Sequence, residues 1–257
     1  MYRPIQIPSV LSKEYGKYVF YKEEEVPNLN GFAMHAFEAY SKTQEPITLK
    51  ETILMQGTID IGFDLDNGWI GFGGVKRTDF EFPWVFPFRN FCIRLKPGAF
   101  YQLTNIPASS IMDDFIPLGS IDETFDEQSF FKLNFEKAKE FLIHYMEELC
   151  HNKAPDQYTT LFDELAEEPP TNTALLYERI GLSIRQCQRV FSKRYGLSPK
   201  MVLTVLRFQK CLDLLINQSI KTDEIIGELD YYDQAHFTND FKRAVGLTPR
   251  ELVELYR

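Results

Sequence analysis

The stretch FSKRYGLSPK, residues 191–200, returns later in the chain as FKRAVGLTPR, residues 241–250. Both copies begin with Phe and share Gly, Leu, Ser or Thr, and Pro in the same register. Glycine and proline interrupt helices, because glycine readily adopts left-handed backbone conformations and proline lacks an amide hydrogen. The repeat therefore predicts two equivalent helices that end at Gly196 and Gly246.

Each of these helices also has a predicted beginning. Phe191 lies eight residues after Ser183, and Phe241 lies eight residues after Asp233. Ser and Asp are favoured at the N-cap because their side-chain oxygens accept hydrogen bonds from the first backbone amides of a helix. In the first copy, Gln186 stands where a capping box places Glu or Gln.

A shorter helix is expected before each of them, at residues 173–180 and 223–229. A short helix, a tight turn and a second helix follow the order of a helix-turn-helix motif, whose second helix enters the major groove of DNA. Between the motifs, residues 201–216 are expected to form a long helix. It would hold the two recognition helices about 34 Å apart, which is one turn of DNA.

The outward faces of the two recognition helices carry the expected DNA contacts. Helical periodicity buries Cys187, Phe191, Phe237 and Phe241 and turns polar residues outward. Arginine pairs with guanine, asparagine with adenine, and alanine contacts the thymine methyl group, which predicts a G-containing first subsite and an A/T-leaning second one. The expected base contacts are Arg185, Gln188, Arg189, Ser192, Gln234, Ala235, Thr238 and Asn239. The expected phosphate contacts are Lys193, Arg194, Arg207, Lys210, Lys242 and Arg243. Any one of these cations alone is equally well explained as a solvated surface residue, and it is the repeat that favours DNA binding.

Charge is unevenly distributed along the chain. The whole chain has a formal charge of -9, yet residues 171–257 hold 13 Lys and Arg against 10 Asp and Glu. A locally basic surface suits a polyanionic partner, whereas the acidic remainder disfavours indiscriminate DNA binding.

Several short motifs in this region form a familiar set: Gly181-Leu-Ser, Gln188-Arg-Val-Phe191, Gly196-Leu-Ser-Pro199, Arg207-Phe-Gln209, Tyr231-Tyr-Asp-Gln234, His236-Phe237, Phe241-Lys242 and Gly246-Leu-Thr-Pro249. Through them the last ninety or so residues resemble the AraC family of bacterial transcription regulators. The resemblance implies a variable N-terminal sensory or dimerisation domain, activation rather than repression, and RNA polymerase as a partner. It also implies base contacts at Arg185, Gln188, Arg189, Gln234, Ala235 and Asn239.

The N-terminal half reads as antiparallel β structure. Residues 59–66 alternate apolar and polar side chains, Asn67-Gly68 is a strong hairpin turn, and residues 69–72 begin a return strand. Further short strands are expected at residues 18–21, 53–55, 91–95 and 100–103. Asp60, Asp64 and Asp66 would lie together on an exposed strand face. A second, shorter resemblance, at Arg94-Leu-Lys-Pro97-Gly-Ala-Phe100, is to an uncharacterised sensory domain of such regulators.

The expected fold class is α+β in two domains, a β-rich sandwich or barrel followed by an all-α unit. Residues 1–166 would form the sensory or dimerisation domain, 167–173 a linker around Pro169-Pro170, and 174–257 the DNA-binding domain. Within it the first motif spans about 174–196, the linker helix about 200–216 and the second motif about 223–246.

Two features of the first domain allow alternatives. The amphipathic stretch from Asn134 to Leu149 packs either on its own β domain, which we favour, or in a coiled-coil seam of a homodimer. The aromatic run that includes Phe82, Trp84, Phe86 and Phe88 either lines a pocket for a small-molecule effector or, as aromatic runs usually do, fills the core.

Other classes of function find less support. No enzyme motif such as Gly-x-Ser-x-Gly or His-Glu-x-x-His occurs, so a β-domain enzyme with a helical appendage is a weak alternative. A regulator acting only through protein partners is the second alternative, which the groove-facing arginines disfavour. The four Cys and four His lack the paired spacing of metal sites, so we expect core thiols, no metal and no cofactor. With neither a membrane-spanning run nor a secretion signal, we expect a cytoplasmic protein without membrane contacts.

Overall fold

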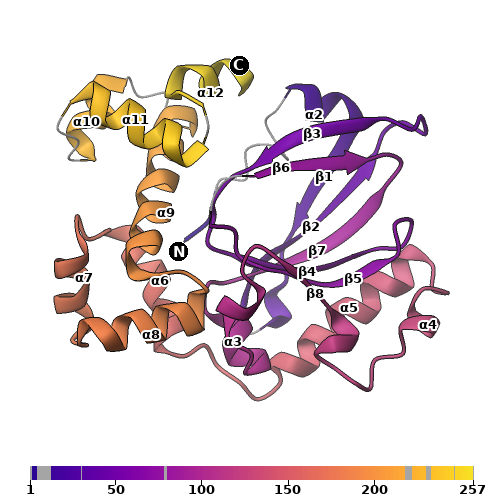
Figure 1. Cartoon of the computed structure of the whole chain (residues 1–257). Coiled ribbons are helices and arrows are strands. Elements are labelled where there is room, and N and C mark those ends of the chain that lie inside the picture. The colour runs from indigo at the N-terminus through magenta and orange to yellow at the C-terminus, as the bar shows by residue number, and fades with distance from the viewer. Residues whose placement is uncertain are drawn as a thin grey trace.

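The computed structural model describes residues 2–4, 13–29, 31–77, 80–217, 222–229, 233–245 and 247–256. Its N-terminal part is built on antiparallel sheets and its C-terminal part is helical (Figure 1), as the sequence predicted. The strands are β1 (Val19–Glu24), β2 (Ala33–Ser41), β3 (Thr48–Ile53), β4 (Ile59–Asp64), β5 (Trp69–Gly73), β6 (Phe80–Val85), β7 (Arg89–Leu95) and β8 (Phe115–Pro117).

Six of these strands form one sheet in the order β1-β2-β7-β4-β5-β8, and β3 pairs with β6 in a second sheet. The predicted hairpin is confirmed, because β4 pairs with β5 from Asp60 opposite Gly73 to Asp64 opposite Trp69. The Asp64 carboxylate accepts hydrogen bonds from the amides of Asp66 and Asn67 and so fixes the four-residue turn.

The six-stranded sheet lies between two layers. Helices α4 (Glu127–Phe130) and α5 (Phe135–Cys150) lie on one side of it, and β3 with β6 lies on the other (Figure 1). The favoured alternative for α5 is confirmed, since Ala138, Leu142 and Met146 are buried in the same core as the sheet. Ala138 and Leu142, which a coiled-coil seam would use, are therefore occupied by packing within the chain.

Three expectations for the β domain were wrong. The strand expected at residues 53–55 is one of them, since β3 ends at Ile53. Residues 100–103 lie in helix α3 (Ala99–Thr104) rather than in a strand, because Gly98 turns the chain with φ 87° and a four-residue apolar run fits either structure. Asp60 and Asp64 do not form an exposed row, since Asp64 is only 3% exposed and Asp60 pairs with the buried Arg94. Alternation marks two faces of a strand, but it does not show that the second face is left uncovered.

The remaining helices follow in the expected order. They are α2 (Lys13–Tyr18) before β1, then α6 (Gln157–Glu167), α7 (Thr173–Ile180), α8 (Ile184–Tyr195), α9 (Pro199–Leu212), α10 (Thr222–Glu228), α11 (Gln234–Val245) and α12 (Pro249–Tyr256). Short 3-10 turns lie at Pro27–Leu29, Ala108–Ile111 and Leu118–Ser120, and a π-helical turn, Asp213–Asn217, extends α9. Within the described residues, no helix is both long and apolar enough to cross a membrane.

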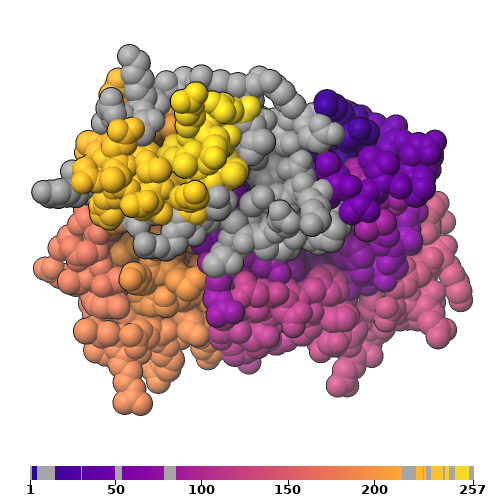
Figure 2. Space-filling model, turned by 45° about the horizontal axis from the view of Figure 1, so that its top comes forward, coloured from indigo at the N-terminus to yellow at the C-terminus, as the bar shows by residue number. Residues whose placement is uncertain are grey.

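The hydrophobic core does not divide where the chain crosses from α6 to α7. Phe191, Tyr195 and Val202 of α8 and α9 belong to the same buried cluster as the β-domain residues Phe72 and Phe100. The second motif has a separate core that contains Phe208, Ile225, Phe237 and Phe241. Figure 2 shows the first motif, in orange, lying directly against the magenta part of the β domain.

Candidate nucleic-acid interface

The first recognition helix, α8, begins and ends as the repeat predicts. The Ser183 hydroxyl accepts a hydrogen bond from the Gln186 amide, and the Gln186 side chain accepts one from the Ser183 amide, which completes the capping box. Gly196 ends the helix with φ 71°. A Cβ at this position would lie 2.6 Å from Val75, so glycine is required by close packing as well as by conformation.

The predicted inward and outward faces of α8 are confirmed. Cys187 and Phe191 are fully buried, whereas Arg185, Gln188 and Arg189 are exposed and Ser192 is half-buried. The exposed face thus presents two guanidinium groups and one amide, which can form paired hydrogen bonds with base edges.

The second recognition helix, α11, has the same arrangement with milder chemistry. The Asp233 carboxylate accepts a 2.7 Å hydrogen bond from the His236 amide, which confirms the predicted cap. Phe237 and Phe241 are buried. The outward residues Gln234, Ala235, Asn239 and Lys242 are exposed, and Thr238 is half-buried. The side chain of Arg243, and Gly246 at the predicted helix end, lie outside the described residues.

Helix α9 joins the two motifs. It has 14 residues, which span about 21 Å at 1.5 Å per residue, and the π-helical turn Asp213–Asn217 continues it. Figure 1 shows α7 and α8 at one end of α9, and α10, α11 and α12 at the other. One helix with its π-helical extension therefore connects the two candidate reading helices.

Arg194 and Tyr195, in the last turn of α8, face the β domain rather than solvent. The Arg194 guanidinium lies 2.6 Å from the Asp156 carboxylate and over the rings of Tyr101 and Tyr158, at 4.8 and 4.9 Å. The Lys193 ammonium lies 4.4 Å from the centre of the Tyr101 ring. We call Tyr101, Asp156, Tyr158 and Arg194 the domain latch.

The latch changes the interpretation of Arg194. Its side chain is only 16% exposed, so in this arrangement it neutralises Asp156 instead of facing outward with Arg189. The neighbouring Tyr195 hydroxyl donates a 2.6 Å hydrogen bond to the Tyr158 carbonyl, and burial raises the pKa of that hydroxyl. Tyr101, Asp156 and Tyr158 were not predictable from the sequence, because no motif or periodicity links them to α8.

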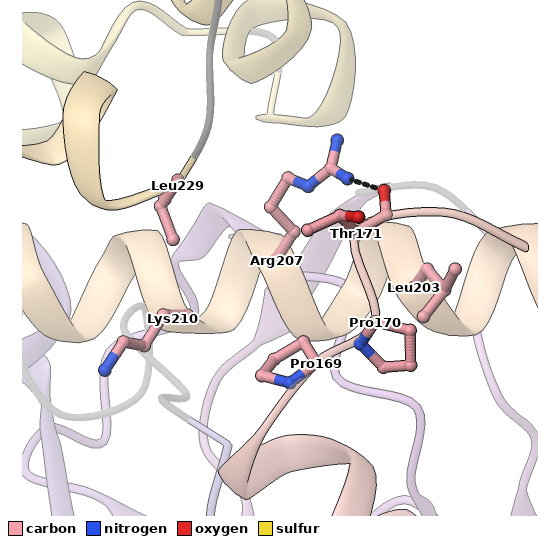
Figure 3. Close-up of a pocket in the computed structure, with 7 residues that line it drawn as sticks. All are labelled: Pro169, Pro170, Thr171, Leu203, Arg207, Lys210 and Leu229. Carbon is pink, nitrogen blue, oxygen red and sulfur yellow. Dashed lines mark hydrogen bonds between the residues drawn. The ribbon is translucent and has the colours of Figure 1, made fainter. Parts of the chain in front are cut away.

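Arg207 and Lys210 lie on α9, beside the segment that joins α6 to α7. They line a pocket of about 120 Å³ together with Pro169, Pro170, Thr171, Leu203 and Leu229 (Figure 3). The Arg207 guanidinium donates a 2.9 Å hydrogen bond to the Thr171 carbonyl. This hydrogen bond therefore holds the linker between α6 and α7 against α9.

Part of the aromatic run, which was one candidate for an effector pocket, forms a packed cluster. Phe86 and Phe88 are buried with ring centres 5.2 Å apart, together with Tyr15, Val19 and Ala39. Phe82 and Trp84 lie on β6, and their side chains are outside the described part of the molecule. The four cysteines are buried free thiols.

The C-terminal sequence matches known proteins. A family model described as a helix-turn-helix domain matches residues 176–254. The transcriptional activator RhaS of Escherichia fergusonii is 32% identical over 75 residues, which are 29% of this chain and 27% of that protein. RhaS of Escherichia coli is 28% identical over 92 residues, which are 36% of this chain and 32% of that protein. The matches thus span less than a third of the length of these curated relatives.

Among solved structures, ToxT of Vibrio cholerae covers 93% of this chain. A ToxT variant crystallised without ligand gives a TM-score of 0.41 at 11% identity, over 97% of that chain. Another ToxT crystal structure gives the same TM-score at 12% identity, over 96% of that chain.

Proposed function

We propose that the protein is a sequence-specific DNA-binding transcription regulator of the AraC type that activates its targets. The match of residues 176–254 to a helix-turn-helix family model supports this proposal. The observation that carries the proposal is the shared design of α8 and α11. Each helix begins at a side-chain cap, buries two residues one turn apart and turns polar side chains outward. The similarity points to a family of regulators rather than to enzymes.

The proposed reading surface consists of Arg185, Gln188, Arg189 and Ser192 on α8, and Gln234, Ala235, Thr238 and Asn239 on α11. Lys242 and Arg243 on α11, together with Lys193, Arg207 and Lys210, are proposed to contact phosphates. Arg194 would join them only in a state in which the domain latch is open.

We further propose that the N-terminal domain binds a small-molecule effector and that RNA polymerase is a partner of the protein. The relatives are named transcriptional activators, and activators act on the polymerase. The buried stripe of α5 is occupied within the chain, so a homodimer would use another surface.

The first test is to select genomic fragments with the purified full chain at moderate salt and to titrate the enriched site against scrambled duplex. We expect a site with two half-elements about one DNA turn apart. No preference over scrambled DNA by folded protein would favour the regulator that acts only through protein partners.

Arg189→Ala then tests the readout directly. Loss of a bidentate contact to guanine costs about 1–3 kcal/mol, or roughly 5- to 150-fold in affinity. Lys137→Ala, at an exposed position of α5, is the control for loss of one positive charge. Unchanged affinity of Arg189→Ala for the selected site would refute the readout model.

A further inference from the structure

An exposed apolar side chain lies at the start of the first recognition helix. Ile184 is the first residue of α8, and it is 58% exposed. Its neighbours Ser183, Arg185 and Gln186 are exposed as well, and burial begins only at Cys187. The whole first turn of α8 therefore projects from the domain.

The second recognition helix has the same construction. Helices α8 and α11 each have 12 residues, and each begins directly after its capping side chain. Residues 233–236 are exposed and burial begins at Phe237, as it begins at Cys187 in α8. In the register of the repeat, Ile184 of α8 matches Gln234 of α11. Ile184 thus occupies the position at which α11 carries a proposed base contact.

The chemistry of isoleucine at this position selects its partner on DNA. In helix-turn-helix complexes, the N-terminal residues of the recognition helix contact base edges in the major groove. The side chain of Ile184 has no hydrogen-bond donor or acceptor, so it can neither pair with the polar atoms of a base nor hold a phosphate. The thymine methyl group is the apolar group that a base edge presents in the major groove.

A single exposed apolar side chain is common on protein surfaces and by itself needs no partner. Two observations distinguish Ile184 from such a residue. It lies one helical turn before Gln188 and directly before Arg185, which both belong to the proposed reading surface. It also matches Gln234 of α11 in the repeat. Leu175 of α7, in the same motif and 46% exposed, shares neither property.

We propose that Ile184 contacts the methyl group of a thymine in the half-element read by α8, and that this contact specifies thymine at that position. The inference deepens the proposed function and rests on it, because it concerns the same recognition helix. The α8 half-element is then read by an apolar contact as well as by the hydrogen-bonding groups of Arg185, Gln188 and Arg189.

The test uses the DNA site that the full chain selects, with each thymine replaced in turn by deoxyuridine. This replacement removes the methyl group and keeps the hydrogen-bonding atoms of the base. For one thymine we expect the Kd of the unaltered protein to rise about two- to fivefold, which is the loss expected for one buried methyl group.

Substitution of Ile184 tests the same contact from the protein side. Ile184→Ala should weaken binding to the thymine site about three- to tenfold. It should bind the thymine and deoxyuridine sites with nearly equal affinity, because its side chain is too short to pack on the methyl group. Ile184→Gln copies the residue of α11 and should move the preference at this base pair from thymine to adenine.

Leu175→Ala is the matched control, because it shortens an exposed apolar side chain of the same motif. It should keep both the affinity and the sensitivity to deoxyuridine. Circular dichroism and urea unfolding verify that each variant is folded, which we expect because both side chains are exposed.

The proposal is overturned if Ile184→Ala responds to every deoxyuridine replacement as the unaltered protein does, or if no thymine of the selected site affects binding. Loss of transcription activation by Ile184→Ala with unchanged DNA affinity would assign Ile184 to a protein partner instead. If the full chain selects no site, the proposed function fails and this inference fails with it. A selected site without a thymine that depends on Ile184 refutes this inference alone.

Discussion

Replacing Arg194 with Ala opens the domain latch, and the structure allows the cost to be estimated. The variant loses a charge-assisted contact of 2.6 Å to Asp156, worth about 1.5–3 kcal/mol. It also loses ring contacts with Tyr101 and Tyr158, worth about 0.5–1 kcal/mol each at partly exposed sites. The Arg194 Nη1 atom is buried without a hydrogen-bond partner. The cost of burying it offsets part of the stabilisation that the Arg194 contacts provide. We therefore expect the free energy of unfolding to fall by about 2–3 kcal/mol.

A double-mutant cycle that combines Arg194→Ala with Asp156→Asn isolates the contribution of this ion pair to the free energy of unfolding. Asp156 also caps α6, since its carboxylate accepts hydrogen bonds from the amides of Tyr158 and Thr159. Asparagine caps a helix about as well as aspartate, so this change removes the charge and keeps the cap. We expect a coupling energy of about 1–2 kcal/mol between the two changes, at the upper end for a partly exposed pair.

Urea unfolding of the four proteins, followed by tryptophan fluorescence and circular dichroism, measures the coupling. Arg185→Ala is the matched control, because Arg185 is an exposed arginine of the same helix and should cost less than about 0.5 kcal/mol. A coupling energy under about 0.3 kcal/mol would show that the contact contributes nothing beyond a surface ion pair and would refute the latch.

Three further outcomes follow from the structure. Gly196→Ala should lower the free energy of unfolding by at least about 1–2 kcal/mol, because its φ is positive and its Cβ would lie 2.6 Å from Val75; unchanged urea unfolding would contradict this. Lys242→Ala should reduce the slope of log affinity against log salt by about 0.9, and a slope equal to that of Lys137→Ala would exclude a phosphate contact. Burial and Arg94 lower the pKa of His35, so the unfolded chain binds more protons than the folded one below about pH 6.5. Stability should therefore fall as the pH drops, by up to about 1.4 kcal/mol per unit, and His35→Leu should remove this part of the slope; an equal slope in both proteins would refute it.

The sequence by itself determined the helical half of the protein. The caps at Ser183 and Asp233, the glycine at 196 and the buried positions of α8 and α11 were all read correctly. These features depend on interactions within one or two helical turns, and residues that lie close in sequence are sufficient to specify them. The β4–β5 hairpin was predictable for the same reason.

Only the tertiary structure decided what covers each face. The short apolar run after Gly98 became a helix, Asp64 of β4 became buried, and Asp60 paired with Arg94 of the neighbouring strand. The latch joins Tyr101, Asp156 and Arg194 from separate elements, and the six-stranded sheet brings His35, Arg94 and Asp60 together from three strands. Such contacts depend on how distant elements pack together, and a periodic pattern gives the face on which a residue lies but not its neighbour in space.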